Sequence, residues 1–361
     1  MTFYYILWVV FYVLGVACLF SKKKIPSVVI ISLLIVVAFC VGFRVDVGAD
    51  WESYVVYFNT NTPGDGRDVV EMEPLFRLSR DLFFLLGLSY QCFFFVFSLF
   101  SLYALVRVAN SFNVTNTPLV LLVYISLSFC AFQLNLMRIG IMCSCVWIAL
   151  SYRNKSMIKT LVWMAIGTGF HYLCLAILPI VLFSNKVIRA KWFLIIIGVS
   201  FVALLTNIGI KVVDSIPLLS TLGRASNYLD PESSFRNGNG VTIGLLFNMF
   251  FCTYLRVKYH KQYTDNPNMR VLINLMLGAI VFSCWLNGLG IIAQRGGQSM
   301  NVALCFIWPY FLAKKHGGDR IAWTFILTAY LLLFYMKSFD STVDRNLVPY
   351  RIEAASFTQK H

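Results

Sequence analysis

The sequence predicts an all-α fold, a polytopic bundle of transmembrane helices that forms a single integral-membrane domain over residues 1–361. The composition supports this, because 59% of the residues are hydrophobic, only 13% are charged, and the mean hydropathy is +0.73. Apolar stretches of about 20 residues, the length that crosses a bilayer core, also recur along the whole chain. A third observation is the uneven division of charge between the loops.

The loop charges predict the orientation of the bundle. If Lys22–Lys24 lies in the cytoplasm, the inner loops carry 17 of the 30 Lys and Arg residues and only two of the 16 acidic residues. This excess places both termini outside. Ten of the 13 outer basic residues are Arg, against six of the 17 inner ones. Because a guanidinium group binds phosphate through two donors, we expect the outer face to handle phosphate.

The net charge of +14 follows from this topology and does not indicate a nucleic-acid partner. The expected contacts of the basic loops are with membrane lipid. The ten cysteines all fall inside apolar segments, where we expect them to pack. No H-E-x-x-H or Asp-x-Asp pattern is present, so the sequence predicts neither a bound metal nor another cofactor.

The expected elements follow in chain order. We predict about ten full spans, at residues 3–20, 26–43, 90–107, 118–134, 136–152, 192–210, 241–256, 271–292, 297–312 and 321–337. Two large outer loops, 44–89 and 211–240, separate some of them. Residues 74–88 are too short and too charged to span, so we expect a helix in the outer interface.

Residues 160–183 are the ambiguous stretch. A single crossing would place the basic residues 186–191 outside and invert every later loop against the charge rule. We therefore expect a re-entrant hairpin that enters from the cytoplasm and turns near Gly167–His171. Each arm has only about 12 apolar residues, so protein must satisfy its backbone within the bilayer.

The first polar constellation is Arg44-x3-Gly48-x-Asp50-x3-Tyr54, where the second span emerges. Arg44 could hold an anion there, while Asp50 accepts a proton or orients a hydroxyl. The alternative is an interfacial anchor at the helix end with a local ion pair.

The second constellation, Gln133-x-Asn135-x2-Arg138, interrupts a long apolar run. The 15 residues from Arg138 to Arg153 span about 22 Å of helix. This is shorter than the ~30 Å hydrocarbon core, so Arg138 should lie in the outer leaflet. An arginine there costs about 2.5–3.5 kcal/mol and indicates function. The alternative is snorkelling to the headgroups.

Three further polar positions are candidate functional sites. His171, in the predicted hairpin turn, could take a proton from a hydroxyl, or could simply be a hydrogen-bonded packing residue. Arg224 and Tyr228 share a helix face in the second outer loop, which could also be a solvated face. Arg295 lies in Gln294–Gly297, a predicted tight link whose glycines would let backbone approach a ligand.

These motifs, in order and together with Glu73-Pro74-Leu75-Phe76, Phe170-His171 and Pro349-Tyr350, resemble the EpsG family of Wzy-type polysaccharide polymerases over nearly the whole chain. The resemblance implies a fold related to the lipid-linked glycosyltransferases and a site facing the periplasm of the bacterial inner membrane. It implies transfer of a growing glycan from undecaprenyl diphosphate to a lipid-linked repeat unit, without metal, beside a chain-length co-polymerase, as in O-antigen or capsule synthesis.

The same resemblance implies roles for individual residues. The diphosphate-binding candidates are Arg44, Arg138, Arg224 and Arg295. Asp50 and His171 are the acid/base candidates. Substrate contacts are expected from Tyr54, Gln133, Asn135 and Tyr228, and both outer loops should contribute to the active site.

Three other functions remain open. A ligase that moves finished glycan from the same lipid to another acceptor would use the same arginines but make no ladder of products. A lipid-oligosaccharide flippase would have a cationic cavity open to both sides and would form no covalent product. A membrane acyltransferase also places a histidine in the bilayer, but would need a route for an acyl donor from the cytoplasm.

Overall fold

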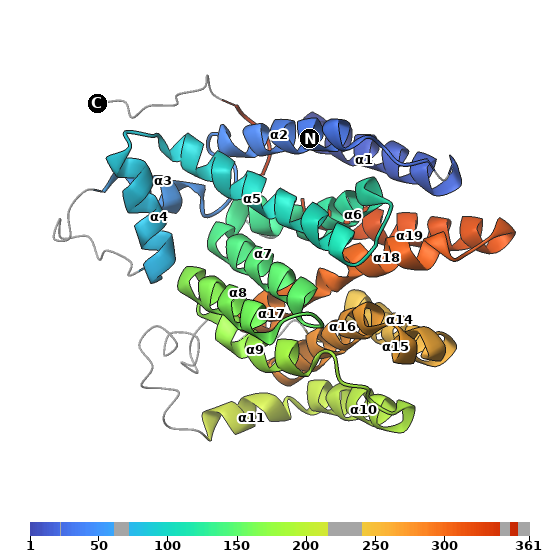
Figure 1. The fold of residues 1–361 in the computed structure, drawn as a ribbon. Helices are drawn as coiled ribbons and strands as arrows, with labels where there is room; N and C mark the ends of the chain where they lie inside the picture. The colour runs from blue at the N-terminus through green and yellow to red at the C-terminus, as the bar shows by residue number, and fades with distance from the viewer. Residues whose placement is uncertain (22, 61–71, 216–239, 340–346, 353–361) are drawn as a thin grey trace. The chain divides into compact units, whose positions relative to one another are not determined.

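The computed structural model describes residues 1–21, 23–60, 72–215, 240–339 and 347–352. Over these ranges the secondary structure is helical, and the only β-type pairing described is an isolated bridge between Arg44 and Ile352. The contacts divide the chain into two compact units, residues 1–175 with 305–361, and residues 176–304. Figure 1 shows the helices coloured along the chain.

Unit 1 contains most of the long helices. They are α1 (Thr2–Ser21), α2 (Ser27–Gly42), α3 (Trp51–Asn59), α4 (Pro74–Leu85), α5 (Tyr90–Ser111), α6 (Thr117–Tyr124), η1 (Ile125–Asn135), α7 (Met137–Tyr152), α8 (Met157–Phe170) and α19 (Gly317–Lys337). Unit 2 contains α10 (Ala190–Thr206), α11 (Ile208–Asp214), α14 (Ile243–Lys258), α15 (His260–Asp265), α16 (Pro267–Trp285) and α17 (Gly290–Asn301). The sequence boundaries between the units fall within α9 (Leu173–Phe183) and α18 (Ala303–Ala313).

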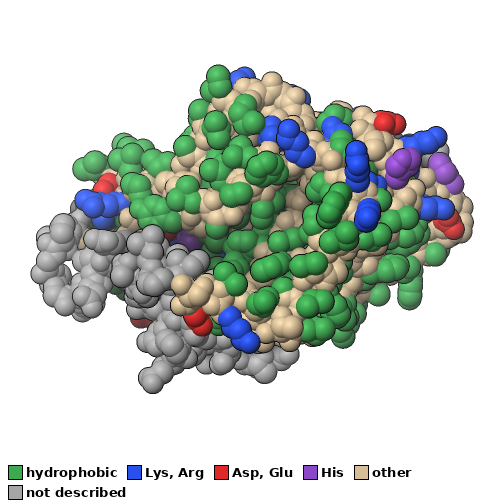
Figure 2. Space-filling model, turned by 90° about the horizontal axis from the view of Figure 1, so that it is seen from below, with side chains coloured by type: hydrophobic (Ala, Val, Ile, Leu, Met, Phe, Trp, Pro, Cys, Tyr) green, Lys and Arg blue, Asp and Glu red, His purple; other side chains and the backbone are tan. Residues whose placement is uncertain are grey.

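The core of unit 1 is built around α7, which is buried along almost its whole length. It packs against α5, α8 and η1, while α2 packs on α5 and α1 on α6. By contrast, α1 and α19 expose large apolar side chains such as Val13 and Leu333. Figure 2 shows hydrophobic side chains over much of one face of the molecule. Such a surface is expected where lipid, not water, surrounds a helix.

Five described helices are long and apolar enough to cross a membrane: Thr2–Ser21, Tyr90–Ser111, Thr117–Asn135, Pro267–Trp285 and Gly317–Lys337. Five more apolar helices have 10 to 17 residues. The predicted class, an all-helical protein with membrane-spanning helices, is therefore supported. The number of ten full spans stays a prediction, because the shorter helices fall below the length of a complete crossing.

The predicted span 118–134 has two parts. It begins as an ordinary α-helix, α6, whose first turn is capped by the Asn116 side chain on the Leu119 amide. From Ile125 to Asn135 it continues as η1, an 11-residue π-helix. π-Helical geometry is rare and is frequently found at functional sites. The polar residues Gln133 and Asn135 lie at the end of this segment.

The chain turns within residues 160–183 as predicted, and the re-entrant course of this segment in the membrane stays a prediction. Helix α8 ends at Phe170 and α9 begins at Leu173. The Cys174 thiol then reaches back to donate to the Met164 carbonyl at 3.3 Å, which requires the chain to reverse. A Cβ added to Gly167 would lie 3.0 Å from the Cys174 sulfur, so the glycine permits this close return. With 14 and 11 residues, both arms are shorter than a full crossing.

The predicted link at Gln294–Gly297 is wrong. Helix α16 ends at Trp285, earlier than expected, and Arg295 lies in the middle of α17. A Cβ on Gly296 would lie 2.1 Å from Phe282 Cε1, and a Cβ on Gly297 would lie 2.2 Å from Ser283 Oγ. These glycines therefore let α17 pack closely on α16, and they do not form a loop.

Candidate functional site

The centre of the candidate site is an ion pair between α4 and α7. Glu73 directly precedes Pro74, which holds its backbone extended at φ −58° and ψ 148° and makes it the N-cap of α4. Its carboxylate does not cap the helix. Instead, Glu73 Oε2 accepts a hydrogen bond of 2.7 Å from Arg138 Nη1. The side chains of Glu73 and Arg138 are 8% and 22% exposed, so the pair is shielded but still reachable from the surface.

His171 lies on the other side of the same carboxylate. Its Nε2 is 3.9 Å from Glu73 Oε1, and its Nδ1 accepts a hydrogen bond of 3.1 Å from the Leu173 amide. The approach of α8 to α4 makes this possible, because a Cβ on Gly169 would lie only 2.5 Å from Leu75 Cγ. The glycine at the end of α8 thus brings the imidazole beside the carboxylate.

Tyr54, on α3, joins the cluster from a third direction. Burial raises the pKa of its phenol, the Arg138 guanidinium opposes this, and Asp50 adds to the rise. Asp50 is the N-cap residue of α3, one helical turn before Tyr54. Tyr54 therefore lies close enough to both Asp50 and Arg138 for each charge to affect its phenol.

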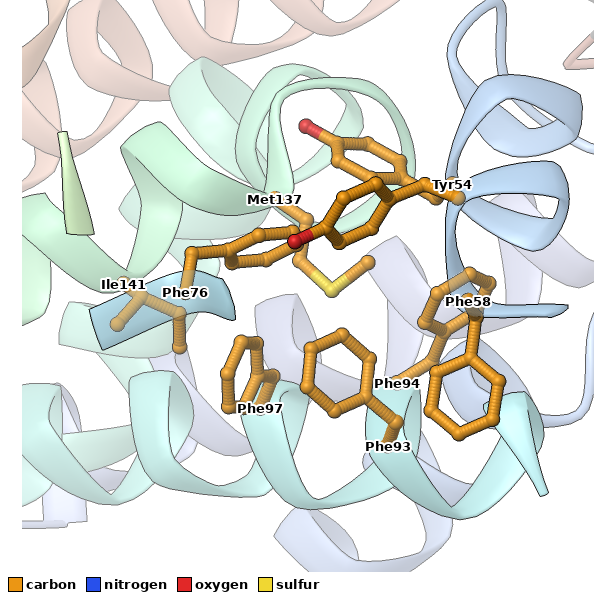
Figure 3. Close-up of a cluster of buried hydrophobic side chains, with 9 residues drawn as sticks. Tyr54, Phe58, Phe76, Phe93, Phe94, Phe97, Met137 and Ile141 are labelled. Carbon is orange, nitrogen blue, oxygen red and sulfur yellow. The ribbon is translucent and has the colours of Figure 1, made fainter. Parts of the chain in front are cut away.

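An aromatic cluster supports these polar groups (Figure 3). The Tyr54 and Phe76 rings lie 5.9 Å apart, and Phe76 packs edge-on against Phe93 of α5. The Arg138 guanidinium lies 6.0 Å from the centre of the Phe76 ring, at the outer limit of a cation–π contact. Rigid aromatic packing therefore fixes α3 and α4 around Arg138.

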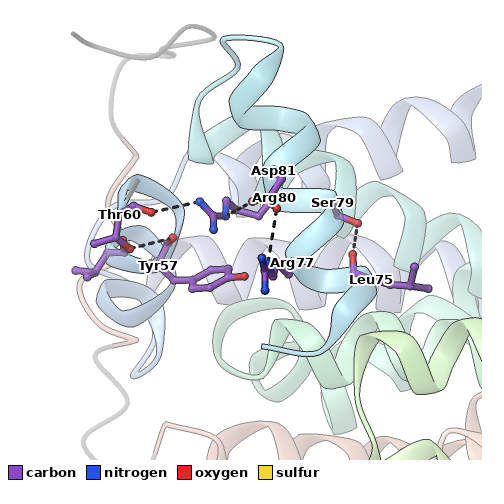
Figure 4. A network of polar contacts seen from close by, with 8 residues as sticks. Tyr57, Thr60, Leu75, Arg77, Ser79, Arg80 and Asp81 are labelled. Carbon is purple, nitrogen blue, oxygen red and sulfur yellow. Dashed lines mark hydrogen bonds and ion pairs between the residues drawn. The ribbon is translucent and has the colours of Figure 1, made fainter. Parts of the chain in front are cut away.

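A second basic group lies on α4, at the end of α3 (Figure 4). Arg80 donates to the Thr60 carbonyl at 3.3 Å, pairs with Asp81 at 3.0 Å and lies 5.0 Å from the Tyr57 ring centre. Arg77 is paired with the same aspartate at 3.9 Å, but its side chain is 68% exposed. Arg80 thus links α4 to the end of α3 through its contacts with Thr60 and Tyr57, whereas the side chain of Arg77 is exposed.

Arg44 is buried completely, with 0% exposure. Its guanidinium donates to the carbonyl oxygens of Val47 at 3.0 Å, Val41 at 2.5 Å and Leu134 at 3.2 Å. It also lies 5.0 Å from the Phe94 ring centre. These contacts join the end of α2 to the end of η1. The described donors point to backbone, and the contact of Arg44 with diphosphate stays a prediction.

Gln133 and Asn135 also make contacts inside the fold. Asn135 accepts from the Ala49 amide at 2.7 Å and donates to the Cys130 carbonyl at 3.0 Å. Gly48, at φ +105°, allows this contact, since a Cβ there would lie 2.1 Å from the Leu134 oxygen. Gln133 donates to the Tyr124 hydroxyl at 2.7 Å. Asn135 therefore holds the loop that carries Asp50, and the substrate contacts stay predictions.

The remaining predicted residues lie elsewhere. Arg224 and Tyr228 fall outside the described residues, as does most of the loop 211–240. Arg295 is half-buried on α17 of unit 2, where its carbonyl accepts from the Ser299 hydroxyl at 2.6 Å. Unit 1 thus brings together Tyr54, Arg138 and His171, with Asp50 adjoining Tyr54.

Sequence reasoning assigned no role to Glu73, although the Glu73-Pro74 motif was visible. The available signal was an acidic residue directly before Pro, at the start of a short helix that carries two arginines. Within the described part of the chain, no group of three or more His, Cys, Asp and Glu side chains could hold a metal ion.

Fold and site together define a membrane protein in which a guanidinium, a carboxylate and an imidazole meet beside buried aromatic rings. The model of the EpsG family matches residues 27–352. The chain therefore belongs to the EpsG family, a family of Wzy-like polysaccharide polymerases. No curated protein and no solved structure matched it.

Proposed function

We propose that this protein is a polymerase that transfers a growing glycan from undecaprenyl diphosphate to a lipid-linked repeat unit on the periplasmic face of the bacterial inner membrane. Membership of the EpsG family supports a glycosyltransferase-like polymerase. The main structural support is the cluster of Arg138, Glu73 and His171, where we propose that the active site lies. Arg138 in this cluster is partly exposed.

The chemistry needs two kinds of group. The diphosphate leaves with the electron pair of its bond to the anomeric carbon, so positive charge must lie where negative charge develops. A preorganised donor of this kind contributes about 10²–10³-fold to the rate. The acceptor hydroxyl must lose its proton, and a base contributes roughly 10²–10⁴-fold.

Among the candidate arginines, we propose Arg138 as the main ligand of the diphosphate. It is partly exposed, whereas the described donors of Arg44 point to backbone carbonyls. We propose Arg224 and Arg295 as further diphosphate ligands, as the family resemblance implies. The resemblance implies Asp50 and His171 as acid/base residues, and we propose that both lie beside the acceptor hydroxyl.

The outer surface of α4 supports a site at the membrane interface. Leu78, Leu82 and Leu85 are 62%, 54% and 83% exposed, and Arg77 is exposed on the same helix. Apolar side chains combined with arginine suit the boundary between acyl chains and headgroups. A lipid-linked substrate in this boundary would have its isoprenoid in the membrane and its diphosphate at the depth of the guanidinium groups.

The test uses the full-length protein, purified and returned to lipid vesicles, with a single undecaprenyl-diphosphate-linked repeat unit as substrate. A polymerase produces a ladder of longer lipid-linked glycans, and we expect the ladder also to form with a chelator present. A ligase would transfer the glycan to another acceptor without a ladder. Unchanged substrate that is merely moved across the bilayer would contradict an enzymatic function and support a flippase.

A further inference from the structure

We infer that Glu73 takes the proton from the acceptor hydroxyl, and that Arg138 keeps this carboxylate covered until the donor diphosphate binds. The inference rests on the proposed function and names a residue for which the sequence predicted no role. It follows from the hydrogen bonds around His171, the position of Glu73 and the environment of Arg138.

The hydrogen bond to His171 decides how this side chain can act. The Leu173 amide donates to Nδ1, so the lone pair of that nitrogen is occupied. In a neutral imidazole with an accepting Nδ1, the proton is on Nε2. The Nε2–H then lies on the side of Glu73 Oε1, 3.9 Å away. At 3.9 Å the two groups are neighbours beyond hydrogen-bond distance. In this state both ring nitrogens of His171 are occupied, so His171 has no lone pair for a proton, whereas the Glu73 carboxylate can accept one.

Glu73 also lies between Arg138 and His171. One of its oxygens contacts Arg138 and the other faces His171. With only 8% of its side chain exposed, it is largely shielded from bulk water, which favours transfer to a sugar over hydrolysis. Asp50 precedes Tyr54 by one helical turn, and the Tyr54 amide donates to the Asp50 carbonyl at 3.1 Å, so we assign Asp50 to orienting the acceptor hydroxyl.

Arg138 determines when Glu73 Oε2 can accept a proton. Its Nη1 occupies Glu73 Oε2, while its buried Nε makes no hydrogen bond to the described residues. The fold therefore satisfies the guanidinium only in part, and its side chain is 22% exposed, so a ligand can reach it. A diphosphate that draws the guanidinium toward itself releases Oε2, so the carboxylate becomes available only when a donor is bound.

The acceptor hydroxyl oxygen attacks the anomeric carbon and forms the new glycosidic bond. Its proton moves to Glu73 Oε2. The bond from the anomeric carbon to the diphosphate oxygen breaks, and its electron pair stays on the diphosphate, held by Arg138. The proton passes from Glu73 to this leaving group, which restores the carboxylate.

The experiment separates turnover from donor binding in the full-length protein in vesicles. Glu73→Gln keeps the shape of the side chain but removes the base and the partner that competes for Arg138. We expect turnover to fall roughly 10²–10⁴-fold, while binding of undecaprenyl diphosphate is retained or tightened. Glu73→Asp should recover part of the turnover. Glu52→Gln, at an exposed carboxylate on α3, is the matched control and should behave as wild type.

Two outcomes for Glu73→Gln overturn the inference. Turnover within threefold of wild type excludes Glu73 as the base. A loss of turnover that matches a loss of diphosphate binding shows instead that Glu73 only positions Arg138. In both cases the wild-type ladder still supports a polymerase. If the wild type makes no ladder, the proposed function fails and the inference fails with it.

Discussion

At the scale of single residues, the structure divides the predicted arginines by what their donors contact. Arg138 shares its charge with a carboxylate and is partly exposed, so a ligand can compete for it. Arg44 is fully buried, and its described hydrogen bonds go to three backbone carbonyls. Identical side chains with such different surroundings should respond differently to substitution.

Arg138→Lys should reduce ladder synthesis about 10²-fold or more, because an ammonium group lacks the planar fork that binds phosphate through two donors. The measurement is the initial rate of repeat-unit addition in vesicles. Arg77→Lys, at an exposed arginine on α4, is the control and should keep most of the activity. A rate for Arg138→Lys within threefold of wild type would remove this residue from the diphosphate site.

Arg44→Ala should lower the thermal stability of the purified protein before any effect on catalysis is considered. Each carbonyl left without a partner in the buried site costs about 1–3 kcal/mol. The measurement is the unfolding temperature in detergent, compared with that of Arg138→Ala. An Arg44→Ala protein of normal stability that has lost diphosphate binding would instead support the role that the sequence predicts.

Asp50→Asn and His171→Ala should each shorten the distribution of glycan lengths, because both residues adjoin the cluster around Arg138 and Glu73. Gel analysis of the lipid-linked products is the measurement. Normal ladders in both variants would show that neither residue takes part in proton transfer or in orienting the acceptor.

At the scale of elements, the site depends on how closely α4 and α8 approach. Gly169 faces Leu75 with no room for a Cβ, and this contact lies beside the pair of His171 and Glu73. The sequence showed a glycine near the predicted turn, and the turn is present. It did not show the partner, because a contact between residues 94 positions apart leaves no local pattern.

Gly169→Ala should reduce turnover, since the added methyl group pushes α4 away and separates His171 from Glu73. Leu75→Ala removes the atoms that clash, so the double variant should recover part of the loss. The measurement is turnover for the two single variants and the double variant. Additive losses in the double variant would show that this contact does not position the site.

At the scale of the whole molecule, hydrophobicity and charge predicted the class of fold, because a membrane selects strongly for both. The helix boundaries at α1, α2, α5 and α7 lie close to the expected spans. The break after Trp285 was missed, although the Asn287-Gly288 pair that follows it is a turn signal in the sequence. The ion pair of Glu73 and Arg138 was also missed, since its partners meet only through packing of α4 against its neighbours.

The predicted orientation can be checked with reporter fusions in cells. Alkaline phosphatase fused after Thr60 should be active, because that position is expected in the periplasm. The same reporter fused after Lys155 should be inactive, because the basic link at 153–159 is expected in the cytoplasm. The reverse pattern would place the cluster around Arg138 on the wrong side for the proposed substrates.

The wide helix η1 affects the angle at which the following chain starts. Its 11 residues advance through fewer turns than the same residues would in an α-helix. Arg138 comes only three positions after the last residue of η1. The direction of its guanidinium group toward Glu73 therefore depends on the π-helical geometry of η1. Deleting a single residue from η1 would rotate the start of α7 and leave the guanidinium aimed at the wrong neighbour, even though every side chain of the cluster were still present.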